Sequence, residues 1–331
     1  MMRKTPAFWY GTAAPPPGLK PLAWLYDRLS RLRRALTSPH HGTVPVLCIG
    51  NITMGGSGKT PVAIAVSHIL HDLGFLPHFL TRGYGGRLKG PVLVKPAQHG
   101  FREIGDEPLL LARHAPCWVA RKRAAGAVAA EEGGAGAIIM DDGFQNPSLH
   151  KNLSFLVIDA AAGFGNGAVF PAGPLRELPQ NGLKRADACI LLGIKDENSR
   201  EDWRQKLQQY GYQNPVFFAD LQPQNPSFDG AFVGFAGIGL PQKFRETLET
   251  CGADVAEFFP FPDHYAYRRE DIKTLLAAAR RHNAALITTE KDAVRLPAKI
   301  RESVKTLPVA LQWQDEQAIT AFLKSKLQKT S

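Results

Sequence analysis

The feature of this sequence that most constrains its fold is a glycine-rich loop between an apolar run and a helical pattern. The loop follows Val44–Ile49 and leads into Pro61–Leu73, where apolar residues recur on one helical face. Backbone amides of such a loop surround nucleotide phosphates, its lysine reaches the terminal phosphates, and its threonine can hold Mg²⁺. The pattern predicts a phosphate-binding loop (P-loop) with these contact residues: Gly55, Gly56, Ser57, Gly58, Lys59 and Thr60.

The loop departs from the usual spacing, which would place a glycine at Thr53, and it doubles the glycine at Gly55 and Gly56. This doubling resembles the deviant loops of partitioning-type ATPases. Those proteins carry a lysine where Met54 stands here. A dimerising motor ATPase is therefore disfavoured, and another branch of the superfamily is indicated.

Length and composition favour two α/β domains in a reducing compartment. The chain has 331 residues, of which 44% are hydrophobic and 21% charged, so it can bury more than one core. Its four cysteines show no C-x-x-C spacing, which disfavours a zinc site and a disulfide framework. No nucleic-acid-binding module is recognisable, and no protein partner is indicated.

The N-terminal segment 1–43 is strongly basic and amphipathic. Seven Lys and Arg side chains stand against Asp27 alone, which accounts for six of the ten net positive charges. Leucines recur at helical spacing from Leu22 to Leu36, so the segment suits an anionic membrane surface. A helix docked on the protein's own core, with a solvated basic face, is the open alternative. No apolar run reaches the ~18 residues of a spanning helix, so we expect only peripheral attachment and no export.

Short apolar runs alternate with helical patterns along most of the chain, which predicts a doubly wound, mostly parallel sheet. The expected strands are Val44–Ile49, Leu76–Thr81, Cys117–Ala120, Ala137–Met140, Phe155–Asp159, Cys189–Gly193 and Val216–Ala219. A Gln- and Pro-rich stretch at 221–226 indicates a linker, and a second, smaller α/β pattern follows it. We therefore predict a P-loop domain at 44–222 and a smaller domain at 223–331 that closes over the cleft.

One expected strand ends in two carboxylates, Asp141 and Asp142. In P-loop proteins an acidic residue at the end of a neighbouring strand holds Mg²⁺. Asp141 is the better candidate for the metal, and Asp142 could assist it or orient an acceptor. A simple strand-to-turn transition is the structural alternative.

Two further residues could carry chemistry. Asp106 precedes a helical pattern, so the residues alone favour a helix cap, with a general base near the γ-phosphate as the alternative. His264 stands in a Pro-Asp-His-Tyr loop of the second domain, where burial is less easily achieved. The cations Arg121–Arg123, at the start of an expected helix, fit either an anion site or a solvated turn.

An ordered set of motifs from about residue 19 to 296 resembles the tetraacyldisaccharide 4'-kinases, the lipid A 4'-kinases of Gram-negative bacteria. The set comprises the P-loop, Thr81-Arg82-Gly83-Tyr84-Gly85, Gly105-Asp106-Glu107-Pro108, Asp141-Asp142-Gly143-Phe144-Gln145, Gly173-Pro174-Leu175-Arg176-Glu177, Pro262-Asp263-His264-Tyr265 and Thr289-Glu290-Lys291-Asp292-Ala293-Val294. Each piece is a modest signal, whereas the set in this order is highly specific.

The resemblance implies transfer of the ATP γ-phosphate to the 4'-hydroxyl of an acylated disaccharide 1-phosphate, giving lipid IVA. It also implies Mg²⁺ and work at the cytoplasmic face of the bacterial inner membrane, in peripheral contact with anionic lipid. Within the family pattern Asp106 and His264 act together as the base, with Lys59 and Asp142 in the catalytic set. Thr60, Asp141 and Glu177 become the expected metal ligands. The rival hypothesis is a P-loop ATPase or GTPase that serves as a switch or chaperone and has no lipid acceptor.

Overall fold

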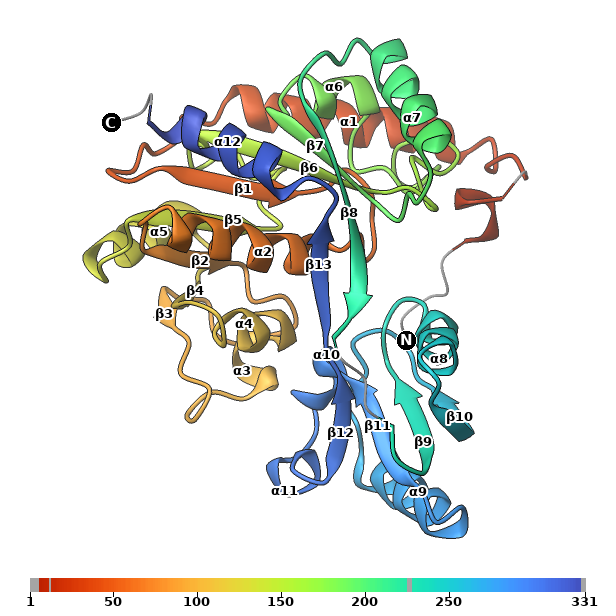
Figure 1. The fold of residues 1–331 in the computed structure, drawn as a ribbon. Coiled ribbons are helices and arrows are strands. Elements are labelled where there is room, and N and C mark those ends of the chain that lie inside the picture. The colour runs from red at the N-terminus through yellow and green to blue at the C-terminus, as the bar shows by residue number, and fades with distance from the viewer. Residues whose placement is uncertain (1–5, 12, 225–227, 329–331) are drawn as a thin grey trace.

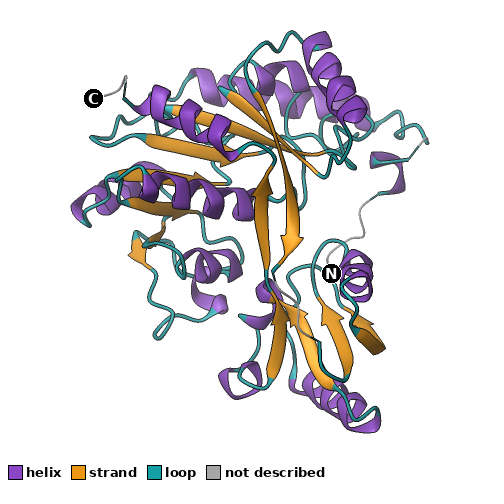
Figure 2. Ribbon diagram, viewed as in Figure 1, coloured by secondary structure: helices purple, strands orange, loops and turns teal. Residues whose placement is uncertain are grey.

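Two twisted sheets, each with helices on both faces, divide the chain into a large and a small α/β domain (Figures 1 and 2). The structure, a computed structural model, describes residues 6–11, 13–224 and 228–328. Part of the basic N-terminal segment (Arg3 and Lys4) and part of the expected linker (Asn225 and Pro226) lie outside the described residues.

The large sheet has nine strands in the order β13-β8-β7-β6-β1-β5-β2-β4-β3. All neighbouring pairs are parallel except those made by the two edge strands β3 and β13, which confirms the predicted doubly wound architecture. The strands are β1 (Val46–Gly50), β2 (Pro77–Thr81), β3 (Val92–Leu93), β4 (Cys117–Val119), β5 (Ala137–Asp141), β6 (Leu153–Asp159), β7 (Ala188–Leu192), β8 (Val216–Pro223) and β13 (Val309–Trp313).

Alternate residues of the central strand β1 enter two separate cores, because side chains of a strand point to opposite faces. Leu47 and Ile49 lie in one core with α2 and α12, whereas Val46 and Cys48 lie in the other. The helices and helical turns of this domain are η1 (Ala7–Trp9), α1 (Leu19–Ala35), α2 (Lys59–Asp72), α3 (Phe101–Ile104), α4 (Asp106–Leu111), α5 (Arg123–Glu132), α6 (Pro179–Leu183), α7 (Glu197–Gln209) and α12 (Glu316–Leu327).

The small domain is a four-stranded parallel sheet in the order β10-β9-β11-β12. Neighbouring residues of β9 serve opposite faces: Phe232 packs in the core that contains α8, and Val233 in the core that contains α9. Its elements are β9 (Ala231–Ala236), α8 (Pro241–Thr250), β10 (Asp254–Pro260), α9 (Arg269–Arg281), β11 (Ala285–Thr289), α10 (Glu290–Ala293), α11 (Ala298–Arg301) and β12 (Val304–Leu307).

The end of the chain returns to the large domain, which differs from the predicted smaller domain at 223–331. Strand β13 pairs antiparallel with β8 from Val309–Pro223 to Trp313–Ala219, and α12 buries Ile319 and Leu323 in a core of the large sheet. The expected linker therefore begins as a strand, and a two-stranded ribbon connects the domains (Figure 1). The sequence pattern missed this because an apolar strand and helix carry no mark of which sheet they join.

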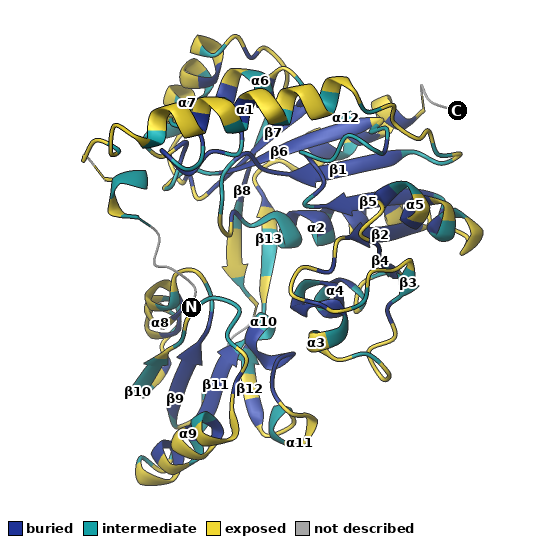
Figure 3. Ribbon diagram, turned by 180° about the vertical axis from the view of Figure 1, so that it is seen from behind, coloured by how far each residue is buried: buried dark blue, intermediate teal, exposed yellow. Residues whose placement is uncertain are grey.

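Helix α1 lies across the back of the large domain and docks through a narrow face (Figure 3). Only Ala23 and Asp27 of this helix are buried. Most of its leucines are exposed, with 56% of Leu29 open to solvent; Trp24 is 61% exposed, and Leu36, which caps the end of the helix, is 77% exposed. The helix docks on the core, as one of the two interpretations expected, and its outward face is apolar as well as basic; contact with a membrane stays a prediction. Among the described residues no helix is long and apolar enough to cross a bilayer.

Candidate active site

The P-loop connects β1 to α2 at the carboxyl edge of the large sheet, where ligand sites of such sheets lie. Gly55 and Gly58 adopt φ of 110° and 76°, a region that side chains other than glycine rarely enter. A Cβ on Gly58 would stand 2.4 Å from the Leu192 side chain. Asn51 Nδ2 donates to Ser57 Oγ at 2.8 Å, and the backbone N–H of Met54 donates to Pro174 O at 2.7 Å. These contacts hold the loop open toward solvent at Gly55.

Thr60 at the start of α2 meets Asp141 at the end of β5. Thr60 Oγ1 donates to Asp141 Oδ2 at 3.0 Å, while the fully buried Oδ1 has no hydrogen-bond partner among the described residues. Burial, with repulsion from Glu107, raises the pKa of Asp141 to about 7 against the attraction of Lys59. An unpartnered carboxylate oxygen beside a threonine hydroxyl fits the oxygen ligands of Mg²⁺. The two predicted metal ligands Thr60 and Asp141 are therefore brought together.

Asp142 follows with φ of 54° and turns its carboxylate toward cations. Arg176 Nη1 lies 2.9 Å from Oδ1 and Lys59 Nζ 3.7 Å from the same oxygen. Burial alone would raise the pKa of Asp142, but these two cations outweigh it and lower the pKa. Lys59 and Asp142 thus lie side by side, and Arg176 is an additional member of the cluster.

Glu177, which the family pattern makes a metal ligand, is fully buried among arginines. Arg185 Nη2 donates to both of its oxygens, at 2.5 and 2.6 Å, and Arg34 of α1 lies 3.4 Å away. Gln145 Nε2 donates to the same carboxylate at 3.3 Å and to Asn51 O at 2.7 Å. In this arrangement Glu177 ties α1 to the base of the P-loop, and guanidinium groups engage both of its oxygens.

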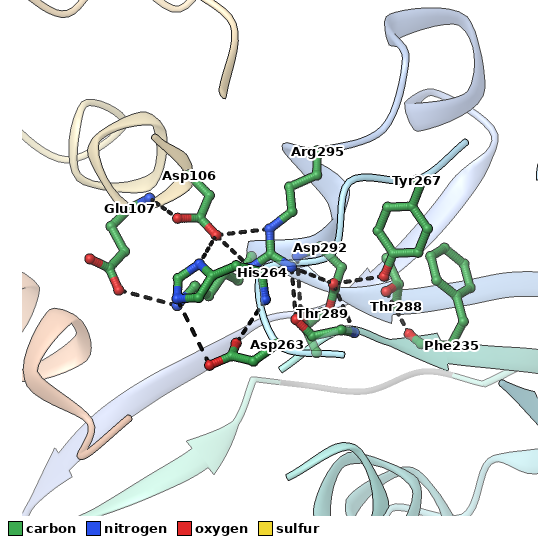
Figure 4. Close-up of polar contacts among 12 residues, drawn as sticks. Asp106, Glu107, Phe235, Asp263, His264, Tyr267, Thr288, Thr289, Asp292 and Arg295 are labelled. Carbon is green, nitrogen blue, oxygen red and sulfur yellow. Dashed lines mark hydrogen bonds and ion pairs between the residues drawn. The ribbon is translucent and has the colours of Figure 1, made fainter. Parts of the chain in front are cut away.

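Asp106 and His264, 158 residues apart, meet at the boundary of the two domains (Figure 4). His264 Nδ1 lies 3.0 Å from Asp106 Oδ2. The helix cap that the residues alone favoured is wrong, because Asp106 is the first residue of α4 and Gly105 is its N-cap. A carboxylate can only accept, so Nδ1 is the donor of this hydrogen bond. The side chain of His264 is 25% exposed and that of Asp106 only 5%. The imidazole is therefore the accessible member of the pair.

The sequence missed Arg295, which completes this group. Its Nε and Nη2 donate to Asp106 Oδ2 at 2.8 and 2.5 Å, and its Nη1 donates to Asp292 Oδ1 at 3.0 Å. A parallel contact joins Lys291 Nζ to Glu107 Oε1 at 3.1 Å. Burial would raise the pKa of Asp106, but the hydrogen bond from His264 and the charges of Lys291 and Arg295 lower it well below its usual range. Arg295 lies just beyond the Thr-Glu-Lys-Asp-Ala-Val motif, and nothing in that motif predicts that the next residue contacts Asp106.

The basic group Arg121–Arg123 lies at the same sheet edge, after β4. Arg123 is buried and its Nη1 donates to Ala120 O, while its Nε has no partner in the described part of the chain. Arg121 Nη2 donates to Gly86 O at 3.3 Å. Arg123 is thus not part of a solvated turn, whereas Arg121 and Lys122 are exposed.

Comparisons with known proteins agree with this geometry. Residues 17–328 match the family described as Tetraacyldisaccharide-1-P 4'-kinase. A tetraacyldisaccharide 4'-kinase of Rhodospirillum centenum is 46% identical over 97% of this chain and 96% of its own length. One of Parvibaculum lavamentivorans is 48% identical over 88% of this chain and 86% of its own length.

A solved structure is similar over nearly the whole chain. The crystal structure of the "apo" form of LpxK from Aquifex aeolicus in complex with ATP superposes with a TM-score of 0.72 at 25% identity, covering 93% of this chain and 98% of that one. The shared fold, the ordered motifs and the near-complete coverage of close relatives agree with one another. The chain belongs to the tetraacyldisaccharide 4'-kinase family.

Proposed function

We propose that this protein transfers the γ-phosphate of ATP to the 4'-hydroxyl of a tetraacyldisaccharide 1-phosphate and so forms lipid IVA in lipid A biosynthesis. The observation that carries the proposal is the meeting of Asp106 and His264, 3.0 Å apart across the domain boundary. A nucleotide switch has no need of a base supplied by a second domain. Family membership likewise favours the kinase over the switch.

In this proposal His264 takes the proton of the sugar hydroxyl. A hydroxyl is a weak nucleophile, so a positioned base must accept its proton as the bond to phosphorus forms. Asp106 holds the imidazole through Nδ1, so Nε2 is the nitrogen that would accept the proton. The small domain thus has a role in the reaction, because it supplies His264 to the side of Asp106 in the large domain.

The phosphate side of the reaction depends on charge. Lys59 lies where it can approach the β- and γ-phosphates, and the backbone amides from Gly55 to Thr60 surround them. Thr60 and Asp141 would hold Mg²⁺, which supplies positive charge to the transferring phosphoryl group when bound. We assign Glu177 a structural role because Arg185 and Arg34 already neutralise it.

Helix α1 gives the proposal its membrane contact. Burying acyl chains is worth ~0.8 kcal/mol per CH₂ group, so the lipid acceptor stays in the bilayer and the enzyme must come to its headgroup. Exposed leucines beside Arg28 and Arg33 suit insertion at an anionic interface. We therefore place the protein at the cytoplasmic face of the inner membrane, peripherally attached through α1.

The test is transfer of ³²P from γ-labelled ATP into the extracted lipid acceptor. Wild type should label the lipid, and His264→Gln should lower kcat by about 10²-fold or more with little change in ATP binding. Hydrolysis of ATP that proceeds equally well without any lipid acceptor, and leaves the lipid unlabelled, would support the switch instead.

A further inference from the structure

We propose that Arg295 is a positioning residue for phosphoryl transfer: it holds the Asp106 carboxylate against His264 and balances its charge. This inference rests on the proposed function. It goes further by adding a third member, from the small domain, to the Asp106–His264 pair.

The geometry of Arg295 is that of a fully buried, bidentate contact. Its side chain is 1% exposed, and both Nε and Nη2 donate to one oxygen of Asp106, at 2.8 and 2.5 Å. His264 Nδ1 approaches the same oxygen at 3.0 Å (Figure 4). The carboxylate is therefore fixed by two small-domain residues at once, and its rotation away from His264 would break both contacts.

Arg295 is itself held rigidly from behind. Its Nη1 donates to Asp292 Oδ1 and to Gly237 O at 3.0 and 2.8 Å. Asp292 in turn accepts from Tyr267 Oη at 2.7 Å and from the Gly237 N–H at 2.9 Å. This arrangement uses the planar fork of a guanidinium, with separate nitrogens for Asp106 and Asp292. A lysine has a single ammonium group and cannot reproduce both contacts in one plane.

The charges around Asp106 show how Arg295 contributes to the electrostatic balance of this carboxylate. From the small domain Asp106 faces Arg295, Lys291 and His264; Glu107 is the acid on its own helix, and Asp263 lies 3.8 Å from His264 Nε2. Asp292 offsets part of the charge of Arg295 from the far side. Arg295 is one of the cations that lower the pKa of Asp106, so its loss raises the pKa of that carboxylate.

Two substitutions separate charge from geometry. Arg295→Met removes the cation, so the acidic limb of the kcat pH profile should move up by about one pH unit, because the base is protonated at higher pH. Its kcat should fall by about 10²-fold from misplacement of the pair, with KM for ATP within about twofold. Arg295→Lys keeps the charge, so its limb should stay near that of wild type while kcat remains reduced. The matched control is Arg281→Met, an exposed arginine of the same domain paired with Glu257, which should change neither quantity.

A second readout does not depend on turnover. The Nδ1–H signal of His264, assigned by its loss in His264→Gln, reports the hydrogen bond to Asp106 and should move upfield in both Arg295→Met and Arg295→Lys, because both lose the two-point grip on the carboxylate. This NMR result would stand even if the lipid were not the acceptor, so the two proposals fail separately. If folded Arg295→Met shows a lowered kcat but neither the acidic limb of the pH profile nor the Nδ1–H signal of His264 moves, Arg295 only braces the two domains and the proposal is overturned. If Arg295→Met does not fold, Arg295→Lys decides. A wild-type kcat in Arg295→Lys overturns the proposal, whereas a reduced kcat with an unchanged acidic limb of the pH profile supports it.

Discussion

At the scale of single residues, the site holds two buried carboxylates in opposite electrical surroundings. Asp106 is met by Arg295, Lys291 and His264, which lower its pKa despite burial. Asp141 is buried with acidic neighbours, and its pKa rises to about 7. The first is thus fixed as an anion by the protein itself, whereas the second is left short of positive charge.

Lys59 and Asp141 should both be indispensable for transfer. Lys59→Ala and Asp141→Asn should each reduce ³²P transfer to the lipid by at least about a hundredfold. Lys59 would offset the phosphate charge directly, and Asp141 would hold the Mg²⁺ that does so. Far-UV circular dichroism should remain that of wild type. Lys195→Ala, which changes an exposed lysine outside the site, is the control. Near-normal turnover in both site variants would remove the nucleotide assignment.

Asp106 should also leave a signature in stability. Its folded pKa lies below the unfolded value of about 3.9, so its stabilisation is present above that pH and is lost as pH falls toward the folded pKa. Asp106→Asn should lower the free energy of unfolding at pH 7 by ~3 kcal/mol, since it leaves Arg295 buried without its carboxylate. In urea titrations at pH 7, 5 and 3, this difference should shrink only at the lowest pH. A difference equally large at pH 3 would refute the ion pair, and exposed Asp202→Asn should show none throughout.

At the scale of elements, two glycines of the P-loop are required for different reasons: Gly58 for the backbone conformation, and Gly56 for the approach of the ligand. Gly58 has φ of 76° and a neighbour 2.4 Å from its absent Cβ, whereas Gly56 faces open space without that strain. Gly58→Ala should therefore cost about 1–3 kcal/mol of stability and also ATP binding. Gly56→Ala should keep the thermal midpoint and weaken only ATP binding, measured by calorimetry, because a methyl group obstructs phosphate approach. Equal loss of stability in both variants would contradict this division.

Helix α1 should bind membranes through its leucines. Replacing Leu25, Leu29 and Leu36 together by Ser should weaken partition onto anionic vesicles at least tenfold, because their apolar surface is already exposed. Added salt should weaken binding of wild type as well, since the arginines are screened. Leu240→Ser, an equally exposed leucine of the small domain, should bind like wild type. Unchanged binding of the triple variant would place the membrane contact elsewhere.

The sequence predicted the central elements and not the peripheral ones, for physical reasons. Central parallel strands are buried on both faces and read as continuous apolar runs, so β1, β5, β6 and β7 were all expected. Edge strand β10 alternates partly exposed residues, and β12 has only four, so neither has that pattern. In the site, Lys59, Thr60 and Asp141 stand in local motifs. Arg295 reaches Asp106 across 189 residues, a contact that no spacing encodes.

At the scale of the whole molecule, the small domain is inserted between β8 and β13. Leu323 of α12 is fully buried in a core of the large sheet, although it follows the small domain in sequence. Leu323→Ala should cost about 2–5 kcal/mol, and hydrogen exchange should accelerate in β1 and β6 while β9 and β11 stay protected. Faster exchange confined to the small-domain strands would contradict this placement. Exposed Lys324→Ala is the control.

The return of β13 and α12 to the large sheet has a consequence for biosynthesis. The large domain is built from two separate stretches of chain, and its strand β13 and helix α12 are translated after the whole of the inserted domain. The inserted half, β9 to β12, is complete before them and can collapse earlier. The core of the large sheet can therefore close only after β9 to β12 have been made, so the small domain can fold before the nucleotide-binding domain is complete.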